Sequence, residues 1–223
     1  MNNIRGIILL GEVEYEFLKE IKRTNMPCIL VDFYNKEINM DSVATENIYS
    51  TYELTNHLFQ NGHTEIGFVG SIYATTSIQD RFLGYYRFLM EHKFKLRDEW
   101  IIPDRNESGE YVEFQLPEQM PTAFVCNCDD TAYRLVRFLK EKGYQVPEDI
   151  SIVSFDNDVY AELCEPKLTT IEVDCKEMAR KAAKLMKKKV ELPETSKHTT
   201  TYVEGNIIYR NSVCRRTKNK GGI

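Results

Sequence analysis

Residues 120–157 read MPTAFVCNCDDTAYRLVRFLKEKGYQVPEDISIVSFDN, and this stretch decides which fold the chain can adopt. Two short apolar runs, AFVC and SIVSF, lie between turn-forming residues. This pattern is typical of strands in a parallel sheet that is covered on both faces. The apolar residues between the runs recur at helical spacing: Ala132, Leu135, Val136 and Leu139. Gly143 then marks the end of that helix. A strand, a crossover helix and a second parallel strand form a βαβ unit, so the stretch predicts an α/β fold.

Polar side chains follow both predicted strands. Cys128 and Asp129 come after the first strand, and Asp156 comes at the end of the second. Ligands of parallel sheets bind beyond the carboxyl ends of the strands. A carboxylate in that place can accept hydrogen bonds from two hydroxyl groups at once. We therefore expect a small polar ligand at this edge of the sheet.

The chain has the composition of an ordinary soluble globular protein. Its 223 residues, 42% apolar and 28% charged, suffice for one large or two small lobes with real cores. No apolar run approaches the roughly 18 residues of a membrane span, and MNNIRG does not open a secretory signal. A net charge of −5 is unlike that of most nucleic-acid-binding domains. We expect a cytoplasmic protein that binds a small molecule and no membrane.

The six cysteines form no recognisable metal or redox motif, since none of them makes a CxxC pair. Cys126 and Cys128 could share one face at the end of a strand, which is poor geometry for a disulfide and incomplete for a metal site. We predict reduced core or loop cysteines, no metal and no cofactor. The lysines of a helix predicted over 176–189 are interpreted as a solvated face, with nucleic-acid binding as the alternative.

Further strand and helix patterns lie on either side of the opening stretch. They include NGHTEIGFVG followed by SIQDRFLGYYRFL upstream, LTTIEVD downstream, and IRGIILLG and PCILVDF near the start. With PTAFVCNCDD and GYQVPEDISIVSFDN, these blocks cover nearly the whole chain. In their order and separation they resemble the effector-binding domain of bacterial transcription regulators of the LacI/GalR family. The resemblance implies a periplasmic-binding-protein-like fold of type I, with two lobes that each hold a parallel sheet flanked by helices.

The resemblance also implies how the chain divides. Residues 1–47 and 175–199 would form the amino-terminal lobe, residues 48–174 and 200–214 the carboxyl-terminal lobe, and residues 215–223 a disordered tail. In the family, a helix-turn-helix headpiece and two strand–helix units come before the first of these blocks. We therefore expect an incomplete amino-terminal lobe that is either poorly ordered or covered by a partner chain.

By the same resemblance, six residues are expected to contact the ligand: Ser77, Arg81, Asp104, Cys128, Asp129 and Asp156. Arg81 is the arginine of the R-x-x-G-Y pattern, and a planar cation suits adjacent hydroxyls or a carboxylate. An intramolecular pair with Asp80 or with an acidic loop is the alternative. Asp156 matches the family's ligand-contacting aspartate.

Two of these positions depart from the family pattern. Asp104 lies near the place where many members have an aromatic side chain that stacks on the ligand, and Cys128 stands where asparagine is common. Asp104 could instead bond ligand hydroxyls or face water. A thiol cannot replace the two-sided hydrogen bonding of a carboxamide. The missing aromatic platform at Asp104 points away from the usual hexose ligand, on which such a platform would stack.

No catalytic motif accompanies these residues, because GxSxG, HExxH, Walker and GxGxxG patterns are all missing. We predict that the chain is not an enzyme but the ligand-sensing and dimerising domain of a LacI/GalR-type regulator. It would bind a small sugar-like effector between two lobes, form a homodimer, and reach DNA only through a headpiece that is not part of this chain. The solute-binding protein of a sugar transporter is the first alternative, and a hydrolytic α/β enzyme is the second.

Overall fold

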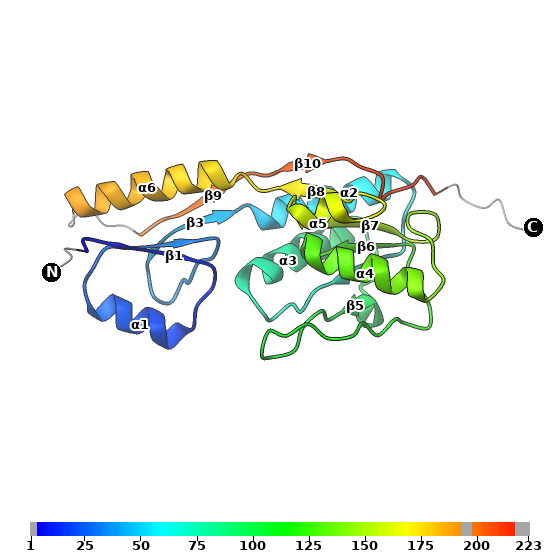
Figure 1. Ribbon diagram of the computed structural model, residues 1–223, viewed down its shortest axis with the longest axis horizontal. Coiled ribbons are helices and arrows are strands. Elements are labelled where there is room, and N and C mark those ends of the chain that lie inside the picture. Colours follow the sequence, from blue (N-terminus) through cyan, green and yellow to red (C-terminus); the bar gives the residue numbers. More distant parts are fainter. Residues whose placement is uncertain (1–3, 193–197, 217–223) are drawn as a thin grey trace, which may run out of the picture. The chain divides into compact units, whose positions relative to one another are not determined.

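The structure is a computed structural model that describes residues 4–192 and 198–216. The chain forms two compact units, each built from stretches that lie far apart in the sequence. The first unit combines Met1–Glu46 with Asp174–Glu204, and the second combines Asn47–Val173 with Gly205–Ile223. Each unit contains one sheet with helices packed against it (Figure 1).

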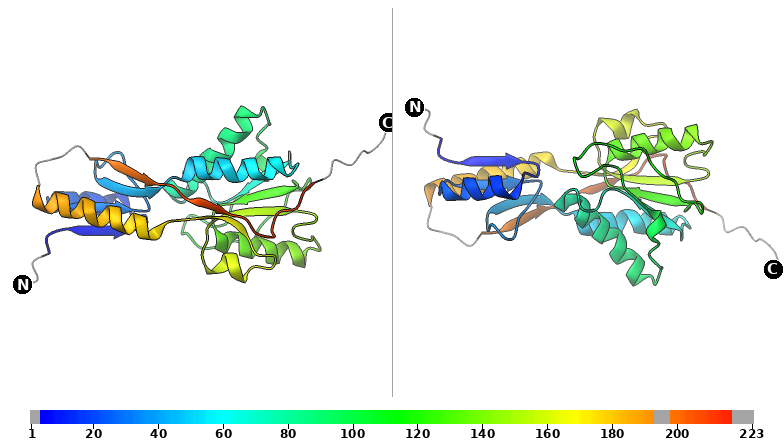
Figure 2. Two further views of the ribbon diagram at one scale, coloured as in Figure 1. Left: turned by 90° about the horizontal axis from the view of Figure 1, so that it is seen from above. Right: turned by 90° about the horizontal axis from the view of Figure 1, so that it is seen from below.

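In the described part of the first unit, a parallel sheet has the strand order β1-β2-β3-β9. Its strands are β1 (Ile7–Leu10), β2 (Cys28–Val31), β3 (Asp41–Thr45) and β9 (Thr200–Val203). The helices that cover it are α1 (Tyr15–Arg23) and α6 (Cys175–Glu191). They lie on opposite faces, as the views from above and below show (Figure 2). Because both faces are covered, β2 is an unbroken apolar run whose residues are all buried.

Strand β1 lies at the edge of this sheet and has β2 as its partner among the described strands. On one face, Ile7 and Leu9 pack against the apolar cluster that α1 completes. On the other face, Ile8 and Leu10 are 49% and 79% exposed. An apolar open edge is a place where a further strand can pair. Coverage of this edge by a partner chain stays a prediction.

The sheet of the second unit, within residues 4–192 and 198–216, has the order β10-β8-β7-β6-β4-β5. Its strands are β4 (Ile66–Val69), β5 (Ile101–Ile102), β6 (Ala123–Cys126), β7 (Ser151–Asp156), β8 (Thr169–Glu172) and β10 (Asn206–Ile208). Neighbouring strands are parallel, except that β10 runs antiparallel to β8. The helices are α2 (Asn47–Gln60), α3 (Thr76–Glu91), α4 (Asp129–Glu141) and α5 (Val159–Leu163). The βαβ unit predicted within residues 120–157 is confirmed as β6, α4 and β7.

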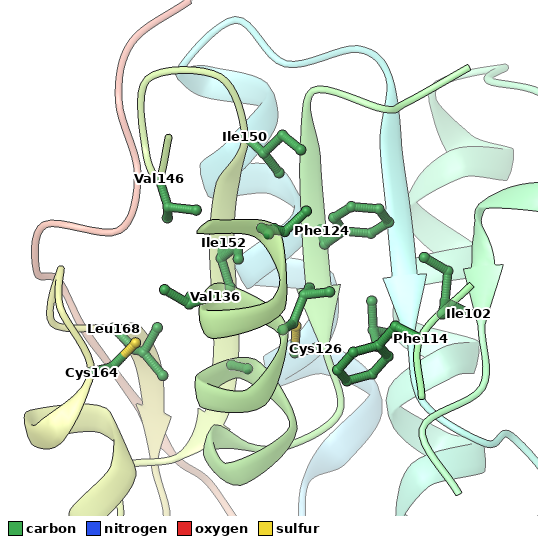
Figure 3. Close-up of a cluster of buried hydrophobic side chains, with 14 of the residues drawn as sticks. Ile102, Phe114, Phe124, Cys126, Val136, Val146, Ile150, Ile152, Cys164 and Leu168 are labelled. Atoms are coloured by element: carbon green, nitrogen blue, oxygen red, sulfur yellow. The ribbon is translucent and has the colours of Figure 1, made fainter. Parts of the chain in front are cut away.

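Alternation along β6 divides the core of the second unit into two clusters. Phe124 and Cys126 point to the face that α4 covers, where they pack with Val136 (Figure 3). Ala123 and Val125 point to the other face and pack with side chains of α2 and α3. One buried strand therefore ties both helix layers to the sheet, which fixes the loops at its carboxyl end.

Two boundaries differ from the prediction. Thr200–Val203, assigned from the sequence to the carboxyl-terminal lobe, is β9 and pairs with β3 in the first unit. The hydroxyl groups of Ser42 and Thr200 meet at 2.9 Å in this pairing. In the predicted tail, Arg216 donates its backbone N–H to the carbonyl oxygen of Asn61 at 2.8 Å, and residues 217–223 lie outside the described residues. A short alternating strand carries no signal of its partner, so the sequence could not place β9.

Gly84 lets α2 and α3 pack closely, and replacing it tests this contact. A Cβ at this position would lie 2.1 Å from the carbonyl oxygen of Ile48 and 3.1 Å from Cβ of Thr51. Because backbone cannot move aside as the tip of a side chain can, we expect Gly84→Ala to lower the free energy of unfolding by about 1–3 kcal/mol. Urea denaturation measures this loss. Leu83→Ala changes an exposed neighbour on the same helix and should cost less than about 1 kcal/mol. Equal losses in the two variants would contradict the packing role of Gly84.

Candidate functional site

The carboxyl ends of β4, β6 and β7 lie side by side along one edge of the second unit's sheet. Beyond this edge the chain passes through short loops into α3, α4 and α5. Ligands favour such an edge because the loops vary freely and the helix starts offer backbone donors. The six predicted ligand-binding residues lie at the ends of these strands, in the loop after β5, or within the first two turns of α3 and α4.

Arg81 forms the centre of this edge and is 6% exposed. Its Nε donates to Oδ1 of Asn47 at 2.9 Å, and its Nη1 donates to the carbonyl oxygen of Asn127 at 2.6 Å. Nη2 forms an ion pair with Oδ1 of Asp156 at 3.1 Å. The guanidinium carbon lies 3.8 Å from the centre of the Phe155 ring. The intramolecular alternative for Arg81 therefore occurs, with Asp156 as the partner, and a ligand contact stays a prediction.

Asp156 presents a carboxylate that is partly open to solvent, since 34% of its side chain is exposed. Its backbone has φ 109°, and that of Asn157 has φ 54°, both in a region that few non-glycine residues adopt. Asn157 accepts a hydrogen bond from Nη2 of Arg210 at 2.7 Å and donates to Glu172 at 3.2 Å. Such constrained backbone is a feature of ligand-binding loops. Asp156 is thus held in place by its neighbours while its carboxylate can still reach a ligand.

Asp104 is completely buried, in contrast to the predicted ligand contact. Its Oδ1 accepts from the backbone N–H of Ser71 at 2.8 Å, and its Oδ2 accepts from Asn127 at 2.9 Å and Thr131 at 2.7 Å. Arg105 completes the set with an ion pair of 2.9 Å. Burial raises the pKa of Asp104, but Arg105 and the hydrogen bonds outweigh burial and hold this pKa below its usual value. The carboxylate joins three loops and has no face left for a ligand.

Asp129 is also completely buried, at the start of α4. It accepts hydrogen bonds from the hydroxyl of Ser154, from the hydroxyl of Thr170 at 2.8 Å and from the backbone N–H of Asp158 at 2.9 Å. Burial raises the pKa of Asp129 to about 6, against the lowering effect of these hydrogen bonds. Asp129 therefore supports the loop that carries Asp156, and in this structure it is enclosed rather than turned to a ligand.

Cys128 and Ser77 are the remaining predicted contacts, and both are partly exposed. Cys128 occupies the N-cap position of α4, and its thiol contacts the hydroxyl of Thr131 at 3.3 Å. Burial and then the nearby charge of Asp156 raise the pKa of this thiol, which favours its neutral form. A ligand contact of Cys128 stays a prediction. Ser77 lies one helical turn before Arg81 on the same side of α3.

Arg105 and Tyr73 are candidate ligand contacts that the sequence reasoning missed. Together with Ser71 and Asn106 they line a hollow of about 520 Å³ at the carboxyl ends of β4 and β5. This volume lies within the range of small-molecule sites. Asp104 was expected to face the ligand, but its carboxylate is buried, and its partner Arg105 is the partly exposed side chain that lines the hollow. Tyr73 is 88% exposed and could supply an aromatic face from the other wall.

Residues 4–192 and 198–216 contain neither a cluster of metal ligands nor a helix that could span a membrane. No group of three or more histidine, cysteine, aspartate or glutamate side chains is placed to hold a metal ion. No helix in these ranges is both long and apolar enough to cross a membrane. The chemistry available at this edge is hydrogen bonding and ion pairing by Arg81, Asp156, Cys128 and Arg105.

Comparison with known proteins gives a consistent set of relatives. The family model of the periplasmic binding protein-like domain matches residues 55–213. The chain is 28% identical over 212 residues to the HTH-type transcriptional repressor PurR of Actinobacillus pleuropneumoniae, covering 93% of this chain and 63% of that protein. It is 28% identical over 221 residues to the arabinose metabolism transcriptional repressor of Geobacillus stearothermophilus, covering 94% of this chain and 58% of that protein.

A solved structure agrees with these relatives. The crystal structure of a LacI-type transcriptional regulator from Bacillus cereus subsp. cytotoxis superposes with a TM-score of 0.82 at 27% identity, covering 96% of this chain and 78% of that one. The predicted fold class, α/β with parallel sheets flanked by helices, is confirmed. The chain spans less than two thirds of the length of the two curated relatives.

Proposed function

The chain belongs to the periplasmic binding protein-like domain family, and from this premise we propose that it is the ligand-sensing and dimerising domain of a LacI/GalR-type transcription regulator. Its ligand would be a small sugar or sugar derivative, the class suggested by the relative that controls arabinose metabolism. In the whole protein, a DNA-binding headpiece would carry the response to the operator in the cytoplasm. This chain by itself should not bind an operator.

The Arg81–Asp156 pair is the observation that carries the proposal. A buried arginine, bonded on three sides, holds a carboxylate that remains 34% exposed at the ligand-binding edge of a parallel sheet. Such a carboxylate accepts hydrogen bonds from neighbouring hydroxyls, and a fixed guanidinium keeps it oriented before the ligand arrives. A polyhydroxylated ligand suits this arrangement.

Regulation then follows from differential affinity. A ligand shifts the conformational equilibrium of a regulator only by as much as it prefers one state over the other. Residues that bond both the ligand and the protein scaffold transmit that preference. Asp156 is bonded to the scaffold through Arg81.

Hydrolysis of a sugar by the purified chain would favour the enzyme alternative. The relatives named above are repressors, which supports a regulator over a transport protein.

Asp156→Asn tests the proposed ligand contact. We expect a thermal-shift screen of sugars, sugar phosphates and nucleobases to find a compound that raises the melting temperature of the chain. That compound should bind Asp156→Asn with at most about a tenth of its affinity for the parent chain, because the amide loses an acceptor and the charge-assisted bonds. Glu141→Gln, at the exposed end of α4, is the matched control and should keep the full shift. An unchanged shift in Asp156→Asn would place the ligand elsewhere.

A further inference from the structure

A second cavity, of about 540 Å³, lies within the first unit at the amino ends of its strands. Cys28 begins β2, Asp41 begins β3, and His198 comes two residues before β9. The last turns of α1 and α6 close the cavity with Lys22 and Lys189. Residues from both ends of the chain thus line one cavity, which includes neither Arg81 nor Asp156.

Lys189 is the most enclosed cation of this cavity, with 9% of its surface exposed. Its Nζ forms an ion pair with Oδ2 of Asp41 at 2.7 Å. The ammonium carries three donors, and among the described residues no acceptor other than Asp41 serves it. A buried ammonium with unused donors is costly unless a water or a ligand accepts from it. Lys189 thus lines the cavity and has donors for which the described residues supply no acceptor.

Asp41, the carboxylate of the cavity, is already occupied. In addition to Lys189, it accepts from the backbone N–H of Thr199 at 3.0 Å, from the Thr199 hydroxyl at 3.2 Å and from Nδ1 of His198 at 3.3 Å. A carboxylate has about four lone-pair positions, and these four contacts use them. Asp41 balances the charge of Lys189 and leaves the other cations of the cavity unbalanced.

Two further cations line the cavity without a carboxylate partner in residues 4–192 and 198–216. Lys22 donates to the carbonyl oxygen of Ile38, which carries no net charge, and Arg5 is an exposed residue that also lines the cavity. The carboxyl ends of α1 and α6 oppose these charges with about half a negative charge each. The positive charges of Lys22 and Arg5, less the partial charges of the two helix ends, leave roughly one positive charge in the cavity. In a chain whose net charge is −5, this local excess marks a place for an anion.

We propose that this cavity binds the phosphate group of a small phosphorylated metabolite. Lys189 and Arg5 contact the phosphate oxygens, because ammonium and guanidinium groups form the strong charge-assisted bonds that phosphate accepts. Met26, Met40 and Val190 line the rest of the cavity and cover the organic part of the ligand. The volume suits a ligand of this size. The domain would then sense a second compound at a place separate from the Arg81–Asp156 pair.

Isothermal titration calorimetry of the intact chain with inorganic phosphate and with ribose 5-phosphate, at ionic strength matched with sodium chloride, tests the proposal. We expect saturable binding of both probes, tighter for ribose 5-phosphate because its sugar covers apolar surface. Arg5→Gln should weaken binding about tenfold, the effect of losing one charge-assisted contact. Arg23→Gln, an exposed neighbour of the same charge that does not line the cavity, should leave binding unchanged.

Two outcomes would overturn the assignment. The first is the absence of saturable binding of either probe, or an equal loss of affinity in Arg5→Gln and Arg23→Gln, which would show only general attraction of charge. The second is loss of phosphate binding in Asp156→Asn, which would move the phosphate to the effector site. Retained phosphate binding in Asp156→Asn supports a separate site, whatever compound the effector site takes.

Discussion

Replacing Arg81 with methionine is expected to lower the free energy of unfolding by about 3 kcal/mol, the lower part of the range for breaking a buried ion pair. The change leaves the side chain of Asn47, the carbonyl of Asn127 and the carboxylate of Asp156 without their donor. Asp156 is partly exposed, so water recovers some of the loss. Methionine keeps contact with the Phe155 ring and limits the change to polar bonding. Urea denaturation at pH 7 measures the difference.

The same helix supplies the control for this experiment. Arg87 pairs with Glu91 at 2.9 Å, but more than half of its side chain is exposed. Arg87→Met should therefore leave the denaturation midpoint nearly unchanged, since exposed pairs contribute little. Arg81→Lys should fall between the parent chain and Arg81→Met, because an ammonium cannot bond in the three directions of the guanidinium. If both methionine variants changed the free energy of unfolding by similarly small amounts, the central role of Arg81 in the site would be contradicted.

Replacing Asp104 with asparagine is expected to cost about 3 kcal/mol or more at pH 7, because it introduces a donor where four donors already converge. The amide nitrogen of the variant would face Asn127, Thr131 or Arg105, none of which can accept from it without rearranging. Ser71 would also lose an acceptor if the amide turned over. Guanidinium or urea denaturation of both chains gives the loss.

The loss should also depend on pH, with a sign set by the lowered pKa of Asp104. A carboxyl group with a lowered pKa in the folded state stabilises the fold above its unfolded pKa of about 4, and this contribution disappears as the pH falls through the folded value. The difference between the parent and Asp104→Asn should therefore be full near pH 7 and shrink below about pH 4. Asp129, whose raised pKa has the opposite effect between about pH 4 and 6, is present in both chains and cancels. A difference that does not change with pH would contradict the charged state of Asp104.

The layers of the fold could be predicted from the sequence because each strand and helix shows a pattern within its own residues. The apolar runs of β6 and β7 and the helical spacing of α4 required no knowledge of distant residues. The pairing of β9 with β3 could not be predicted in this way. It joins residues about 158 positions apart, and Thr200–Val203 has no feature that selects β3 over a strand of the second unit.

The candidate site was predictable by region but not by side-chain direction. Residues at the strand ends could be named, yet which of two neighbours faces inward depends on the pleat of the strand and on the donors inside. Asp104 turns inward because Asn127, Thr131 and the backbone N–H of Ser71 donate to it there. Arg105 pairs with the same carboxylate and is the more exposed of the two neighbours. Asn127, one place before Cys128, likewise turned out to join the Asp104 and Arg81 networks.

The most direct test of a ligand site at the carboxyl end of the second unit's sheet is amide chemical-shift mapping by NMR. The compound that stabilises the chain most in the thermal-shift screen would be titrated into the labelled chain. We expect the largest shifts at Ser71, Cys128 and Asn157, which follow β4, β6 and β7. Shifts that instead gather at Glu65 and Thr122, at the amino ends of β4 and β6, with Ser71, Cys128 and Asn157 unmoved, would contradict it.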